Sequence, residues 1–114
     1  MSIFPDREAG FEQKLAHDEE VAFLLRMGRE RRFALWAANR MGLGEEEAAA
    51  YARALVQAAL NGETDAALVA RVGRDLSERG VSASPVELSE AMLRAEEGAR
   101  RQIIGADPTV LGQP

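Results

Sequence analysis

The chain has 114 residues, of which 46% are hydrophobic, and a net charge of −5, so it can form one domain with a modest core. It has no cysteine and one histidine, which leaves no disulfides, no thiolate metal site and no residues for a histidine metal cluster. The acidic balance argues against general nucleic-acid binding. No apolar run approaches the ~20 residues of a membrane span. We expect a cytoplasmic protein that is not an enzyme and holds no metal.

The composition between the prolines indicates an all-α fold. Proline occurs only at positions 5, 85, 108 and 114, and alanine, leucine, glutamate and arginine dominate the stretches between them. These four residue types are good helix formers. No run shows the two-residue alternation of a strand. We therefore predict a four-helix bundle.

The first predicted helix runs from about Asp6 to about Met41 and changes character along its length. Phe4, Phe11 and Leu15 form a thin apolar stripe at helical spacing, whereas the part after Val21 carries a broad apolar face. A thin stripe buries too little area to repay the entropy of ordering the chain. We therefore expect residues 1–20 to be an interaction segment that is frayed or disordered in the free protein.

Charge is also unevenly distributed along this first helix. Residues 1–20 carry six acidic and two basic side chains, whereas residues 26–40 carry five arginines and one glutamate. This polarity matches the helix macrodipole, which is one interpretation. The other is a binding site for the phosphates of ADP or ATP, although no glycine-rich phosphate loop accompanies it. Its candidate residues are Arg26, Arg29, Arg31 and Arg32.

Glycines and capping residues divide the rest of the chain into three further helices. Short connections favour antiparallel neighbours, so residues 21–105 form the four-helix domain and residues 106–114 a flexible tail. Ser84, Pro85 and Glu87 match a capping box followed by proline at the first helical position. The other expected signals are the turn at Gly42 and Gly44, the stop at Asn61 and Gly62, a cap at Thr64 or Asp65, and the stop at Gly80.

The opening residues resemble a known family. The run F-x-D-R-E-x-x-F-E-x-K-x-A-H-D-E-E, from Phe4 to Glu20, and the later LWAANRMGL are similar to the zeta subunit of alphaproteobacterial F-type ATP synthases. This resemblance implies a small four-helix protein whose N-terminal segment inhibits ATP hydrolysis. The segment would enter a catalytic α/β interface of the rotary head and contact the central γ subunit. The residues implied are Phe4, Asp6, Arg7, Glu8, Phe11, Glu12, Lys14, Leu15 and His17.

The resemblance also implies an oligomeric state and a location in the cell. We expect a monomer when free, held at the cytoplasmic face of the inner membrane when bound to the synthase. In that complex the Phe4, Phe11 and Leu15 stripe would become buried, so that the segment folds as it binds. The alternative function is a nucleotide-responsive helical binding module with little or no inhibitory activity.

Overall fold

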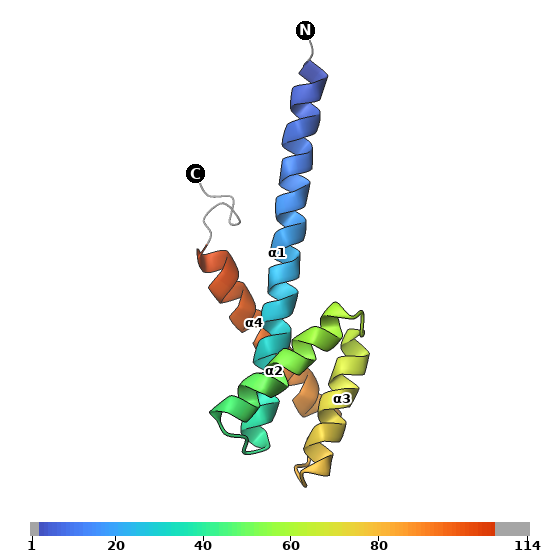
Figure 1. Cartoon of the computed structure of the whole chain (residues 1–114), viewed down its shortest axis with the longest axis vertical. Helices are drawn as coiled ribbons and strands as arrows, with labels where there is room; N and C mark the ends of the chain where they lie inside the picture. Colours follow the sequence, from blue (N-terminus) through green and yellow to red (C-terminus); the bar gives the residue numbers. More distant parts are fainter. Residues whose placement is uncertain (1–2, 107–114) are drawn as a thin grey trace.

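The protein is built from four α-helices, as the sequence predicts. A computed structural model describes residues 3–106, with side chains from Lys14 to Gly105. The helices are α1 (Ile3–Arg40), α2 (Glu45–Leu60), α3 (Asp65–Glu78) and α4 (Pro85–Ala106), and the described residues contain no strand (Figure 1). The first helix begins three residues before the predicted Asp6, and α4 extends to Ala106, the first residue of the predicted tail. Residues 107–114 of that tail lie outside the described residues.

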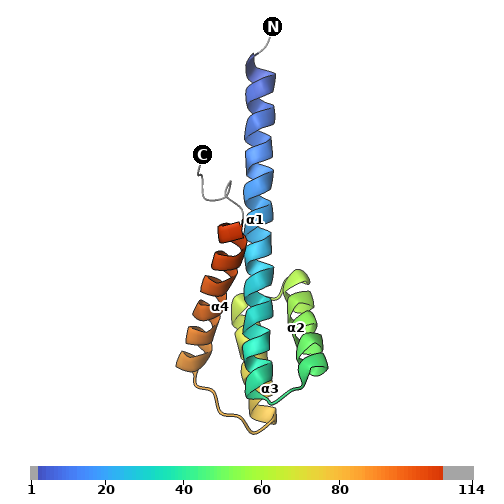
Figure 2. The ribbon, with the colours of Figure 1, turned by 90° about the vertical axis from the view of Figure 1, so that its left-hand side faces the viewer.

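The long first helix is the axis of the molecule. Successive helices run in alternating directions, and the C-terminal half of α1 packs mainly against α4 and α2 (Figure 2). The third helix has smaller contacts with each of the other three. The N-terminal half of α1 extends past the ends of the other helices, which gives a molecule 68 Å long and 28 Å wide. The predicted overhang is therefore present as helix; its fraying in the free protein stays a prediction.

The core combines a few large side chains with many alanines. Phe33, Leu55, Leu68, Val72 and Leu76 are the largest fully buried apolar residues. Alanines of α1, α2 and α4 fill the space between them, which lets the helix backbones approach closely. Met92 and Ile103 of α4 are only half-buried, because the small residues at 91, 95 and 99 occupy the centre of the contact.

The helix ends follow the local signals in the sequence. At Gly80 the backbone φ of +76° permits two closing hydrogen bonds, from Gly80 N–H to the Ser77 carbonyl and from Val81 N–H to the Leu76 carbonyl. The same pattern ends α1 at Gly42 and α2 at Gly62. These stops fix the short connections, and thereby the antiparallel order of the helices.

Two side-chain caps confirm the predicted helix starts. The Thr64 hydroxyl accepts a hydrogen bond from the Ala67 backbone N–H at 3.1 Å, so Thr64 caps α3. At α4 the Ser84 backbone N–H donates to Glu87 at 3.0 Å, and the Glu87 N–H donates to the Ser84 hydroxyl at 3.1 Å. This reciprocal pair is the predicted capping box.

None of the helices, over the part of the chain that is described, has the length and apolarity needed to cross a membrane.

Candidate functional site

The predicted interaction segment forms the free end of α1. Residues 4–12 belong to the helical backbone of α1, and their side chains lie outside the described residues. Lys14 is exposed, Leu15 is 48% exposed, and His17 is half-buried. The structure thus places these last three residues on one continuous helix, beyond the enclosed part of the bundle.

Along the described side chains of α1, the bundle encloses the helix only from residue 30 of the chain onwards. Among the described side chains, the first buried one on α1 is Glu30. Leu24, which the sequence assigns to the broad apolar face, is 43% exposed, and Phe23 beside it is 50% exposed. Apolar side chains that are about half exposed therefore continue along α1 past residue 20.

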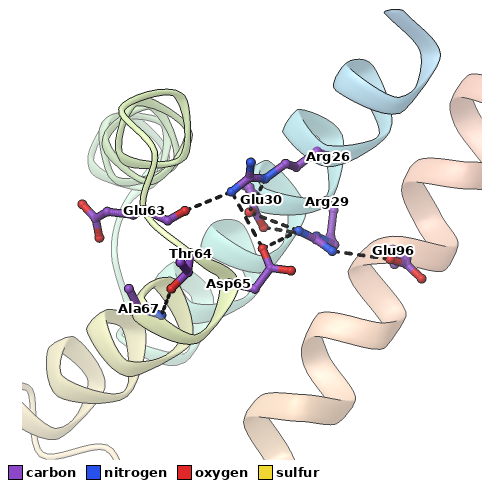
Figure 3. Close-up of polar contacts among 8 residues, drawn as sticks. All are labelled: Arg26, Arg29, Glu30, Glu63, Thr64, Asp65, Ala67 and Glu96. Atoms are coloured by element: carbon purple, nitrogen blue, oxygen red, sulfur yellow. Dashed lines mark hydrogen bonds and ion pairs between the residues drawn. The ribbon is translucent and has the colours of Figure 1, made fainter. Parts of the chain in front are cut away.

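The four candidate arginines do not converge on one site. Arg26 and Arg29 lie together on the side of α1 that faces α3 and α4 (Figure 3). Arg31 lines a separate groove between α1 and α2. Arg32 lies over Gly98 of α4 and donates a hydrogen bond to Gln102.

Arg29 is the centre of an ion-pair cluster that joins three helices. Its Nη2 lies 2.7 Å from Asp65 at the start of α3, and its Nη1 lies 3.5 Å from Glu96 of α4. The same guanidinium donates to both carboxylate oxygens of Glu30, at 3.3 and 3.4 Å. Arg26 adds an ion pair to Glu30 at 3.7 Å and a hydrogen bond to the Glu63 carbonyl at 2.9 Å (Figure 3).

Burial makes this cluster different from surface ion pairs. The Glu30 side chain is 0% exposed and that of Arg29 is 15% exposed, whereas Asp65 and Glu96 are open to solvent on one side. Burial by itself lowers the pKa of Arg29, but the hydrogen bond to Glu30 and the charges of the three carboxylates outweigh it and raise the pKa. A buried carboxylate needs such a partner, since its desolvation is costly.

An open hollow lies beside the cluster. Its volume is about 550 Å³, and α1, the start of α3 and the second half of α4 form its walls. Arg26, Arg29 and Arg100 supply positive charge, and Asp65 and Glu96 supply negative charge. Ala22 and Leu25 add apolar surface, so the hollow is mixed in character and close to electrically balanced.

No group of three or more histidine, aspartate or glutamate side chains within the described residues could hold a metal ion. The single histidine, His17, lies far along α1 from the ion-pair cluster, about 18 Å before Arg29 at 1.5 Å per residue. The surfaces that stand out are the projecting helix, the hollow beside the cluster and the groove beside α2.

Sequence reasoning missed the acidic half of the cluster. It counted Glu30 only as one negative charge in an arginine-rich stretch, although Glu30 follows Arg26 by four residues, the spacing of a helical ion pair. Asp65 is predicted only as a possible cap, and no local pattern assigns a role to Glu96. The ion pairs of Asp65 and Glu96 with Arg29 depend on how α3 and α4 pack on α1. Residue spacing along one helix does not predict that packing.

Comparison with known proteins gives one family. A family model described as ATPase inhibitor subunit zeta matches residues 1–102 of the chain. No curated protein and no solved structure matches. The matched range takes in α1, α2, α3 and most of α4, so it includes both the projecting segment and the bundle.

Proposed function

Since the chain belongs to the ATPase inhibitor subunit zeta family, we propose that it blocks ATP hydrolysis by an F-type ATP synthase through residues 1–20. In this proposal the segment enters a catalytic α/β interface of the rotary head. It contacts the central γ subunit there and opposes rotation in the hydrolytic direction. The four-helix domain stays outside the interface and holds α1 in a fixed orientation.

The projection of α1 is the observation that supports this proposal most directly. From Ile3 to Leu25 the helix runs for 23 residues before Arg26, which donates a hydrogen bond to the Glu63 carbonyl in the connection between α2 and α3. At 1.5 Å per residue this is about 35 Å of helix. Such a length is enough to reach well into a cleft between two subunits while the bundle remains at its mouth.

The residue types of the segment suit an interface that forms only in the complex. Phe4, Phe11 and Leu15 recur at helical spacing among charged residues. Burying one large apolar side chain contributes roughly 1.5–3 kcal/mol. Three of them supply binding energy that the isolated helix cannot use, and the charged residues Arg7, Glu8, Glu12 and Lys14 then set the register at the rim.

The test is inhibition of ATP hydrolysis by the purified rotary head of the source organism's synthase. We expect Phe11→Ala to raise the concentration needed for half-inhibition by about tenfold or more, the cost of losing one buried phenylalanine. Phe23→Ala is the matched control, because Phe23 is an exposed phenylalanine of the same helix beyond residue 20. Equal potency of Phe11→Ala and wild type would contradict the inserted-segment mechanism.

A truncated chain that lacks residues 1–16 separates inhibition from folding. The buried core on α1 starts at Glu30, so we expect this chain to keep its helical circular dichroism and its cooperative unfolding. It should not inhibit. Inhibition by the truncated chain at wild-type potency would assign the effect to the four-helix domain.

A second candidate function is binding of ADP or ATP in the hollow beside the ion-pair cluster. The observation that favours it is the meeting of Arg26, Arg29 and Arg100 around a space of about 550 Å³ at the start of α3. A helix N-terminus and arginine side chains both attract phosphate. A bound phosphate would compete with Asp65 and Glu96 for Arg29, which predicts weak binding.

Amide chemical shifts during a titration with ADP or ATP test this second function. We expect changes confined to the residues around the hollow, and their loss in Arg100→Ala, whose side chain is exposed. Arg31→Ala is the control, because Arg31 lies outside the hollow. Absence of localised changes at millimolar nucleotide would eliminate this candidate.

A further inference from the structure

A groove between α1 and α2 is separate from both surfaces described above. It has a volume of about 670 Å³, and its lining is mostly apolar. Leu35 of α1 and Ala48, Ala49, Ala52 and Val56 of α2 form the apolar lining. The alanines fill little space, so the surface stays hollow where longer side chains would close it.

Two arginines stand on opposite walls of this groove. Arg31 comes from α1 and Arg53 from α2, and both are exposed. Over side chains 14–105 neither of them has an ion pair or a hydrogen bond, whereas Arg26, Arg29, Arg40 and Arg71 all pair with carboxylates. Glu45 is the one acidic residue of the groove lining. The groove thus presents unpaired positive charge on a chain whose net charge is −5.

We propose that this groove docks an acidic amphipathic helix of the synthase rotary head. Apolar side chains on one face of such a helix would fill the space above the alanines, and its flanking carboxylates would pair with Arg31 and Arg53. This inference rests on the proposed function, because it takes the synthase as the partner. It adds a second docking surface on the four-helix domain.

The dimensions of the groove suit a short helix. Along α2 the groove lining extends from Glu45 to Gln57, which is about 18 Å at 1.5 Å per residue. A docked helix of about three turns spans this length and carries anchors at positions i, i+4, i+7 and i+11. An extended peptide would cover the same length with five or six residues and would leave much of the hollow empty.

The position of the groove explains what a second contact would add. Arg31 lies 16 residues after Leu15 on one continuous helix, so the groove begins about 24 Å from the end of the apolar stripe. Two contacts joined by a rigid helix raise the effective concentration of each for its own site. Docking at the groove would hold the bundle on the rotary head while the segment enters or leaves the catalytic interface.

The experiment compares two charge reversals in the full chain. Arg53→Glu places a negative charge on the wall of the groove, and Arg74→Glu makes the same change at an exposed, unpaired arginine of α3 outside the groove. We expect Arg53→Glu to weaken binding to immobilised rotary head, and to raise the half-inhibition concentration, by about tenfold. The Arg74→Glu chain should stay within about twofold of wild type.

A second variant tests the apolar part of the groove. Ala49 is exposed, so Ala49→Phe fills the hollow without disturbing the buried core, and the fluorescence of Trp36 reports that the fold is intact. We expect it to weaken binding by at least as much as Arg53→Glu. Equal binding of wild type, Arg53→Glu and Ala49→Phe would overturn the proposal.

The remaining outcomes separate this inference from the proposed function. A wild-type chain that binds the rotary head through the groove but does not inhibit would sink the inhibitory mechanism alone. A wild-type chain that neither binds nor inhibits would remove both.

Sedimentation of the free chain tests another occupant of the groove. If the wild-type mass rises with concentration towards twice 12.4 kDa, and that of Arg53→Glu does not, the groove takes a second copy and the proposal is wrong.

Discussion

Replacing Arg29 by leucine tests whether the buried ion-pair cluster holds α3 and α4 on α1. The variant leaves the Glu30 carboxylate, which is 0% exposed, with only Arg26 as a cation, 3.7 Å away. Removing one partner of a buried pair costs about 3–5 kcal/mol. The exposed partners Asp65 and Glu96 lose one ion pair each, which adds at most about 1 kcal/mol per pair.

We therefore expect Arg29→Leu to lower the free energy of unfolding by about 3–5 kcal/mol at pH 7, most of it from the buried Glu30 charge that loses its closest partner.

Urea unfolding, followed by circular dichroism and by the fluorescence of the single tryptophan, measures this cost. Arg32→Leu is the matched control, since Arg32 is a half-buried arginine of the same helix that donates a hydrogen bond to the neutral Gln102. The double variant Arg29→Leu/Glu30→Leu removes both charges and should recover most of the loss. If Arg29→Leu costs no more than Arg32→Leu, or if the double variant is as unstable as Arg29→Leu, the reasoning is refuted.

Two further predictions concern the helix start of α4 and the single tyrosine. Ser84→Ala should lower the free energy of unfolding by about 1 kcal/mol at neutral pH. The Ser84 backbone N–H donates a hydrogen bond to the Glu87 carboxylate and lowers the pKa of that carboxyl group from 4.5. The stabilisation from this hydrogen bond is therefore present above pH 4.5 and is lost as the pH falls further. Burial raises the pKa of Tyr51, as does its 2.6 Å hydrogen bond to Asp75. The unfolding free energy should therefore fall as the pH rises above about 10, and this fall should be absent in Tyr51→Phe. Phenolate absorbance of native protein near pH 10 would contradict the second prediction, and an unchanged urea midpoint for Ser84→Ala would contradict the first.

Much of the fold follows from the sequence because its signals are local. The stops at Gly42, Gly62 and Gly80 need only a glycine that adopts positive φ after a helical stretch, and the capping box needs only Ser84 and Glu87 three residues apart. These interactions form within one turn of the chain. They fix four helices with short connections, and short connections impose the antiparallel order.

The sequence also predicts a segment, residues 1–20, that stands apart from the bundle. A stripe of three apolar residues among charged ones indicates too little core-forming surface before Val21, and the structure encloses α1 only from Glu30. The stretch between Val21 and Glu30 is intermediate. Met27 packs against the core, and Arg26 and Arg29 reach Asp65, whereas Phe23 and Leu24 are about half exposed.

Only the tertiary structure decided how the charged residues are used. Arg26, Arg29, Arg31 and Arg32 are neighbours in sequence, but successive residues of a helix point about 100° apart. The packing of α3 and α4 draws Arg26 and Arg29 to Asp65 and Glu96, and the packing of α2 places Arg31 beside Arg53 across a groove. Each of these groupings brings together residues that are more than twenty positions apart in the sequence. Local spacing determines where helices begin and end, but the contacts between them depend on which faces the whole core brings together.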